Sequence, residues 1–257
     1  MKTAATFRLA AMGGGEDVRR MDDPNLPQSP PFDRKYFMAL KRGWKMGCLG
    51  IGGVALIAIL MLFLAEYLYL RKHAHSRGMT ETVNNARQIG IALAEFQIEY
   101  GKYPDATTIP EVSKRADSSF ALGDRFSNEL FAQLMVSGIS QSELMFYTRT
   151  KSSKKPDNVF DSEATMLAAG ECGFAYIMGV DPMGDPMTPL ALGPTIPGTK
   201  EFDGRANRDK IVVLKVDNSV MSLPIDGNGK VLFKGLDILD PRQSFWNGKA
   251  PDVRWPK

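Results

Sequence analysis

Apolar and polar residues follow a different pattern in each of three parts of the chain. In the first part, residues 46–65 read MGCLGIGGVALIAILMLFLA and carry no charged side chain. A helix that rises about 1.5 Å per residue needs about 20 such residues to cross the hydrocarbon of a bilayer. The run therefore predicts a transmembrane helix, which we place at 46–70. A buried core helix is the alternative, but soluble helices of this length show a polar face and this run has none.

The second pattern covers residues 80–100, where apolar residues recur at steps of three and four. This spacing predicts an amphipathic helix with one stripe to bury. Gly101 and Pro104 are expected to end it. Residues 71–79, which contain the helix-weakening Gly78, are expected to form a juxtamembrane linker. The stripe consists of Val83, Ala86, Ile89, Leu93, Phe96 and Tyr100.

In the third part, short apolar runs alternate with turn residues. Residues 125–138 predict a second helix, and Asp217-Asn218 and the run 226–229 have the composition of hairpin turns. The Pro- and Gly-rich residues 180–198 are expected to be a long loop. The fold class is therefore α+β, with the amphipathic helix packed on one face of a small antiparallel sheet in a domain at 80–257. The predicted strands are 173–178, 210–216, 219–225 and 230–235.

Charge is distributed unevenly between the two sides of the predicted span. Residues 1–45 hold nine Lys/Arg and five Asp/Glu, which leaves 23 basic and 24 acidic residues of the totals of 32 and 29 for the rest of the chain. This balance excludes a basic nucleic-acid surface in the folded domain. The basic flank before the span places the N-terminus in the cytoplasm and the domain on the periplasmic side of an inner membrane.

The segment before the span shows no periodicity. Residues 1–45 are expected to be a disordered basic cytoplasmic arm, and Met38 is an alternative start. A cleavable signal peptide is the competing interpretation of the apolar run, but Phe63-Leu64-Ala65 puts a large residue where the peptidase needs a small one. We therefore expect the helix to be retained.

Catalytic chemistry has little support in the sequence. The only histidines are His73 and His75 in the linker, so Ser-His and Cys-His mechanisms are excluded in the C-terminal domain. Cys48 and Cys172 offer neither a disulfide framework nor a CxxC metal site, and both are interpreted as small buried residues. We expect a protein that is not an enzyme.

Oxygen ligands for a calcium ion are the one metal-binding candidate. Asp181 with Asp185, and Asp226 with Asn228, have part of the spacing of a calcium loop but lack its bidentate glutamate. Ordinary Asx turns are the alternative. A monomeric anchored module whose sheet-side loops bind calcium or an external ligand is therefore the second functional hypothesis. Three aromatic residues near the end either form a partner-binding patch or pack on the sheet: Phe245, Trp246 and Trp255.

The apolar helix running into NNARQIGIALAEFQIEYGKYPD, residues 84–105, resembles type IV pilin-like proteins and type II secretion pseudopilins. The tracts 127–147, 167–177 and 212–220 are similar to large pilin-like proteins of verrucomicrobial type, and DPMGDP at 181–186 is similar to a turn of major pseudopilins. The resemblance implies a structural or interaction component of an envelope or secretion-type assembly, and calcium in the sheet-side loops. It rests most directly on Asn85, Gln88, Ile89, Gly90, Ala92, Leu93, Gly101, Tyr103 and Pro104.

The sequence departs from that family at the cleavage site. Gly50 is followed by IGGVA rather than by a motif with a glutamate, and Glu66 lies at the opposite end of the span. Small residues nevertheless allow helices to approach closely in a membrane, which predicts self-association or contact with other pilin-like subunits. The small residues expected at that contact are Gly43, Gly47, Gly50 and Gly53.

Overall fold

A computed structural model describes the backbone of residues 34–257 and the side chains of residues 56–70 and 78–257, apart from Ala206. The chain divides into two compact units, Met1–Met61 and Leu62–Lys257. The part of the predicted arm at 1–33 lies outside the described residues. So do the surroundings of Gly43, Gly47, Gly50 and Gly53 and the side chains of His73 and His75.

Helix α1 covers Arg34–Tyr100 and ends where the sequence predicts. Gly101 has a φ of +78°, a left-handed conformation that glycine adopts at no steric cost. The helix also runs through residues 34–45, which the sequence assigned to the disordered arm, and through residues 71–79, which it assigned to a linker. Gly78 does not interrupt it, because a single glycine inside a helix costs only about 1 kcal/mol relative to alanine.

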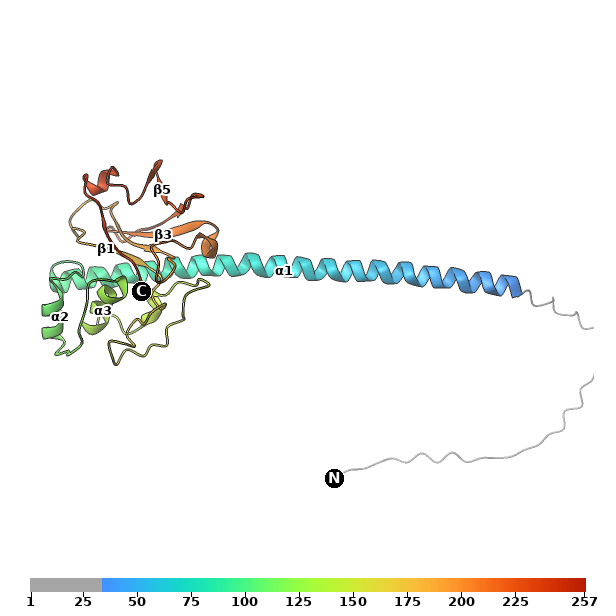
Figure 1. Cartoon of the computed structure of the whole chain (residues 1–257), viewed down its shortest axis with the longest axis horizontal. Helices are drawn as coiled ribbons and strands as arrows, with labels where there is room; N and C mark the ends of the chain where they lie inside the picture. The colour runs from blue at the N-terminus through green and yellow to red at the C-terminus, as the bar shows by residue number, and fades with distance from the viewer. Residues whose placement is uncertain (1–33) are drawn as a thin grey trace, which may run out of the picture. The chain divides into compact units, whose positions relative to one another are not determined.

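The stripe of α1 predicted at 80–100 is buried. Ala86, Ile89, Leu93 and Phe96 have no exposed surface, while Ile98 on the opposite side is 82% exposed. Two further helices, α2 at Ile109–Arg115 and α3 at Ser127–Val136, pack in the same core. Within Leu62–Lys257, Figure 1 shows β1 and β3 on one side of this part of α1 and α2 and α3 toward the other.

The main sheet has five antiparallel strands in the order β4-β3-β2-β1-β7. A separate two-stranded hairpin, β5-β6, follows β4 in the chain. Short 3-10 helices lie at Glu143–Phe146 (η1), Gly204–Asn207 (η2) and Ser244–Trp246 (η3). The strands are β1 Ala175–Met178, β2 Pro189–Gly193, β3 Lys210–Lys215, β4 Val220–Pro224, β5 Leu232–Phe233, β6 Leu236–Asp237 and β7 Asp252–Arg254.

Both faces of the sheet are buried, whereas the sequence predicted a helix on one face only. Along β3, Val212 and Leu214 belong to the core that contains α1 and α3, while Ile211 and Val213 belong to a second core. This alternation is the period of two expected of a strand. The second core is closed by C-terminal residues that include Phe245 and Trp246, which the sequence left open between a partner patch and packing on the sheet.

Three strand predictions need correction. The residues 180–198 are not all loop, since β2 within them lies at the centre of the main sheet. The predicted strand 230–235 shortens to β5, which pairs with β6 and not with the main sheet. The polar segment Asp252–Arg254 adds an edge strand, β7, that the sequence did not predict. The coarse fold class, α+β with an antiparallel sheet, is confirmed.

Candidate functional site

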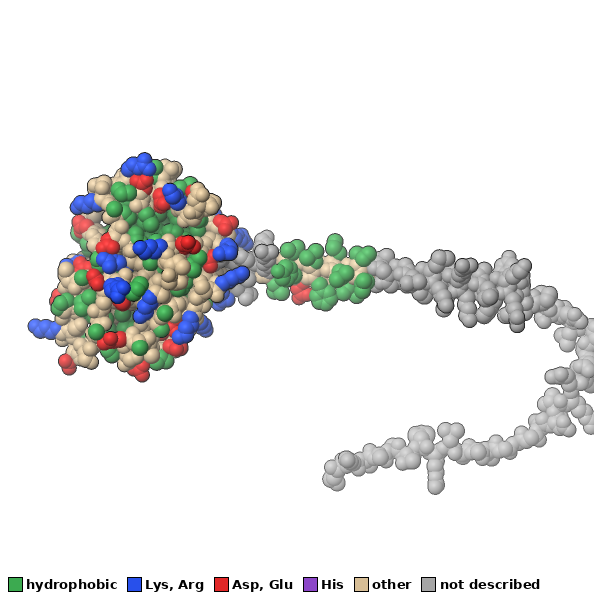
Figure 2. All heavy atoms as spheres, viewed as in Figure 1, with side chains coloured by type: hydrophobic (Ala, Val, Ile, Leu, Met, Phe, Trp, Pro, Cys, Tyr) green, Lys and Arg blue, Asp and Glu red, His purple; other side chains and the backbone are tan. Residues whose placement is uncertain are grey.

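The apolar segment of α1 is the largest uncovered hydrophobic surface that the structure describes. Every large apolar side chain between Leu56 and Leu70 is between 51% and 70% exposed. In Figure 2 the part of α1 between the two grey stretches is largely green, with one red acidic side chain among the apolar ones. Soluble monomers rarely leave so large an apolar surface in water. The exposed side chains are Leu56, Ile57, Ile59, Leu60, Met61, Leu62, Phe63, Leu64, Tyr67, Leu68, Tyr69 and Leu70.

The predicted membrane span begins before this exposed segment. Its residues 46–55 lie outside the residues whose side chains are described. Among the described residues, no helix combines the length and hydropathy required of a membrane span.

A cluster of three carboxylates lies between η1 and the loop that precedes β1. Glu143, Asp157 and Glu171 each place a carboxylate oxygen within 4.8 Å of the others. Among the described residues, no other three acidic, His or Cys side chains lie this close together. Glu143 and Glu171 are completely buried. No sequence pattern predicts this cluster, because the three residues are separated in the chain and none belongs to a metal-binding motif.

Each buried carboxylate of the cluster already has partners. Glu143 accepts hydrogen bonds from the backbone N–H groups of Leu167 at 2.6 Å and Asn158 at 3.0 Å. Glu171 accepts from the ammonium of Lys154 at 2.6 Å and from the N–H of Ala168 at 2.9 Å. A cation would have to displace these donors, so the geometry is that of a clamp that fixes the loop preceding β1.

The pKa shifts of Glu143 and Lys154 reflect the burial and the ion pair of this clamp. Burial raises the pKa of Glu143 above its usual value, with a further contribution from nearby Glu171. The hydrogen bond and charge of Glu171 raise the pKa of Lys154 and so favour its ammonium form. Lys154 thus stays charged over the physiological range and remains a donor to the clamp.

The four calcium candidates remain in the two pairs that the sequence proposed. Asp181 and Asp185 lie in the loop between β1 and β2 and line one cavity of about 370 Å³, together with Trp246. Asp226 lies in the turn after β4, outside that cavity's lining, with Asn228 two residues later.

Each aspartate among the candidates forms an Asx turn. The Oδ1 atoms of Asp181 and Asp185 accept the N–H groups two residues later, at 2.9 and 2.8 Å. Asp226 accepts from the N–H groups of Asn228 and Lys230, and these bonds lower its pKa. Local turns thus account for the aspartates, which was the alternative interpretation of the sequence.

Cys172 lies in the core, as the sequence predicts for a small buried residue. Burial raises the pKa of its thiol to about 11, so the thiolate is scarce near neutral pH. The thiol donates to the carbonyl of Phe174 at 3.5 Å and lies 3.6 Å from the hydroxyl of Ser127. This environment does not activate a nucleophile.

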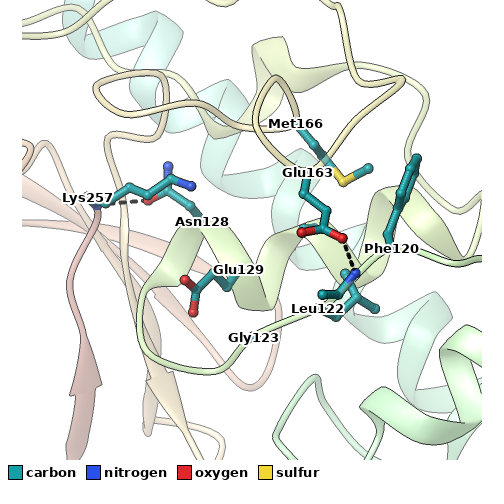
Figure 3. Close-up of a pocket in the computed structure, with 10 residues that line it drawn as sticks. Phe120, Leu122, Gly123, Asn128, Glu129, Glu163, Met166 and Lys257 are labelled. Atoms are coloured by element: carbon teal, nitrogen blue, oxygen red, sulfur yellow. Dashed lines mark hydrogen bonds between the residues drawn. The ribbon is translucent and has the colours of Figure 1, made fainter.

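A small pocket lies beside α3, with Phe120, Leu122 and Met166 around it (Figure 3). Its volume of about 40 Å³ suits a few water molecules rather than a substrate. The Glu163 carboxylate accepts the N–H of Ala121 at its edge. The pocket is therefore a small packing gap at the surface, since Ala121 and Glu163 at its edge are exposed.

Comparisons with protein-family models, curated proteins and solved structures find no match to this chain.

Proposed function

We propose that the chain is a single-pass, membrane-anchored protein of pilin-like architecture that serves as a non-enzymatic structural or interaction component of an envelope or secretion-type assembly. The observation that carries the proposal is the exposed apolar segment Leu56–Leu70, continuous in one helix with the buried stripe that the sheet covers. Transfer of such a side chain out of water is worth roughly 1.5–3 kcal/mol. Twelve side chains, each more than half exposed, then give on the order of 10 kcal/mol for insertion.

The architecture of the C-terminal unit supports the pilin-like part of the proposal. An amphipathic helix that continues an apolar one and packs on an antiparallel sheet is what the family resemblance at residues 84–105 implies. Gly90, one of the resembling residues, lies where α1 meets the β3–β4 hairpin. A β-carbon there would come within 2.9 Å of a methyl group of Leu214. This small residue thus permits close packing of helix and sheet.

Membrane insertion is tested with two charge variants of the full chain. Ile57→Arg with Leu60→Arg adds two cations to the apolar segment, at about 2.5–3.5 kcal/mol each near the centre of a span. The matched control, Ile91→Arg with Ile98→Arg, adds the same charge at exposed apolar positions of the same helix. We expect the wild type and the control to stay in membranes washed with alkaline carbonate and the first variant to be released. A wild-type chain found in the wash would refute the proposal.

Orientation and assembly need separate measurements. With a cytoplasmic N-terminus, an added protease should digest the C-terminal unit in spheroplasts and should not reach it in inverted vesicles. Self-association through the helix predicts that Gly47→Leu with Gly50→Leu lowers the oligomer fraction in neutral detergent. An unchanged oligomer fraction would exclude helix contact at these glycines while leaving the membrane anchor intact.

A further inference from the structure

A basic cavity shares no lining residue with the sites described so far. Its volume is about 490 Å³, within the range of small-ligand pockets. Two segments far apart in the chain form it: the loop 149–152 that follows η1 and the segment 196–205 that follows β2. The cavity is lined by Arg149, Thr150, Lys151, Ser152, Ile196, Asp203 and Arg205.

The loop that carries two of the three cations is fixed at both ends. The Asn85 side chain on α1 donates to the carbonyls of Tyr147 at 2.8 Å and Leu144 at 3.0 Å. At the other end, the N–H of Lys154 donates to the carbonyl of Gly170 at 2.9 Å. The cationic side chains are therefore presented by an ordered loop, which lowers the entropic cost of binding.

The second segment is fixed as well. Asp203 is buried, its N–H donates to the carbonyl of Pro194 at 2.9 Å, and its carboxylate accepts the N–H of Arg205 at 3.1 Å. The Asp203 carboxylate is thus engaged with the backbone at the start of η2. The exposed guanidinium of Arg205 is left as the charged group that this segment offers to the cavity.

Positive charge is concentrated here in a unit that is otherwise balanced. Residues 149–155 read RTKSSKK, with four cations in seven positions. Glu171 engages Lys154, and Glu81 lies 3.6 Å from Arg149 with both side chains partly exposed. In the described part of the chain, neither Lys151 nor Arg205 forms an ion pair. Of the three cations that line the cavity, two therefore have no ionic partner among the described residues.

We propose that this cavity binds a phosphate group, supplied by the headgroup of an anionic phospholipid. Arginine and lysine with adjacent hydroxyls, as in Arg149, Lys151 and Ser152, are the donors that suit phosphate oxygens. The lipid as source rests on the proposed membrane anchor. Arg149 pairs with Glu81, which follows Leu70 by eleven residues, or about 16 Å of helix. Headgroups at the end of the apolar segment would therefore lie about 16 Å along the helix from the residue that pairs with Arg149.

The test is native mass spectrometry of the full chain released from neutral detergent doped with phosphatidylglycerol or with phosphatidylcholine. The cavity variant carries Arg149→Gln, Lys151→Gln and Arg205→Gln. The control variant removes the same charge from exposed lysines that do not line the cavity: Lys114→Gln, Lys230→Gln and Lys234→Gln. We expect phosphatidylglycerol adducts on the wild type and the control, and an affinity lower by about tenfold or more in the cavity variant. Equal adducts on all three proteins would overturn the proposal.

A second variant is expected to raise the affinity for phosphatidylglycerol, a change that misfolding would not produce. Glu81→Gln removes the carboxylate that competes for Arg149 and should tighten phosphatidylglycerol binding by roughly threefold. Unchanged or weaker binding in this variant would contradict the role of Arg149.

Inorganic phosphate separates the two sources of the anion. The melting temperature is measured in phosphate and in chloride at equal ionic strength. One outcome is that phosphate raises the melting temperature of the wild type but not of the cavity variant, while phosphatidylglycerol gives no adduct. This outcome would support the cavity as an anion site and overturn the lipid assignment. The membrane proposal is judged independently by the carbonate wash. A chain that is washed from membranes yet still binds phosphate would refute the anchor alone.

Discussion

Gly173 lies where three segments of the chain meet, and its replacement by alanine tests the packing directly. Its N–H donates to the carbonyl of Phe146 at 2.8 Å, and its carbonyl accepts from the N–H and hydroxyl of Thr195 at 2.9 and 3.0 Å. A β-carbon at this position would lie 2.7 Å from the β-carbon of Thr148 and 2.8 Å from the Thr148 backbone nitrogen. Because a backbone atom cannot rotate away, the two segments would have to separate.

The expected cost combines two effects. Overpacking costs typically about 1–3 kcal/mol, and the loss of one hydrogen bond at Gly173 adds about 1 kcal/mol. Gly173→Ala should therefore lower the free energy of unfolding by about 2–4 kcal/mol. At roughly 2–4 °C per kcal/mol for a unit of this size, the melting temperature should fall by about 5–15 °C.

The assay is thermal unfolding of the full chain in neutral detergent, followed by circular dichroism. Gly227→Ala is the matched control, because no atom lies within 4 Å of a β-carbon there and its φ is not in the left-handed region. We expect the control to stay within about 0.5 kcal/mol of the wild type. Equal melting of the two alanine variants would refute the packing argument. Adding Thr148→Ala should restore little stability, since the backbone contact remains.

Three further predictions concern the clamp, the second core and calcium. Because burial raises the pKa of Glu143, its contribution to the free energy of unfolding falls as pH rises above about 4.5 and through its folded pKa. Glu143→Gln should therefore flatten that part of the profile of unfolding free energy against pH, measured by urea unfolding. A variant profile identical to that of the wild type would contradict this prediction. Trp246 donates its indole N–H to a backbone carbonyl at 2.7 Å, so Trp246→Phe should cost about 1–2 kcal/mol and Trp246→Ala about 3–5 kcal/mol in guanidinium unfolding. Adding calcium or a chelator should leave the melting temperature unchanged, because Asp181, Asp185 and Asp226 already accept backbone hydrogen bonds. A melting temperature that rises with calcium in the wild type but not in Asp226→Asn would restore the calcium hypothesis.

Hydropathy patterns correctly predicted the helices and strands whose apolar residues recur on the side that is buried. The stripe at 80–100 is buried as predicted, and α3 and β3 lie within the predicted ranges because each has one apolar side facing the core. The turn at Asp217-Asn218 is also confirmed, with Asn218 at a φ of +60°. These features depend on local sequence alone.

The central strand β2 escaped prediction for a physical reason. Its apolar run is short and bounded by Pro189 and Pro194, residues that normally mark loops. Pro189 is the first residue of the strand, and the register shifts between it and Ala191. The missing N–H of Pro189 thus falls at an irregular point of the ladder.

The basic cavity could be predicted only in part. Four cations within 149–155 are visible in the sequence, but they resemble any solvated loop. Arg205 gave no local signal, because its contribution depends on the long-range contact between the segment after β2 and the loop after η1. Such tertiary proximity has no counterpart in periodicity.

The segment from Asp252 to Lys257 ties together parts of the chain made much earlier. Beyond β7, the carbonyls of Trp255, Pro256 and Lys257 accept the N–H groups of Ser127, Gly198 and Gly170. During synthesis the strands before it are released first, but the edge of the sheet and the start of α3 stay open until this segment leaves the ribosome. Folding of the C-terminal unit therefore finishes only after nearly all of it has been made, and ribosome-bound intermediates should expose the edge of β1.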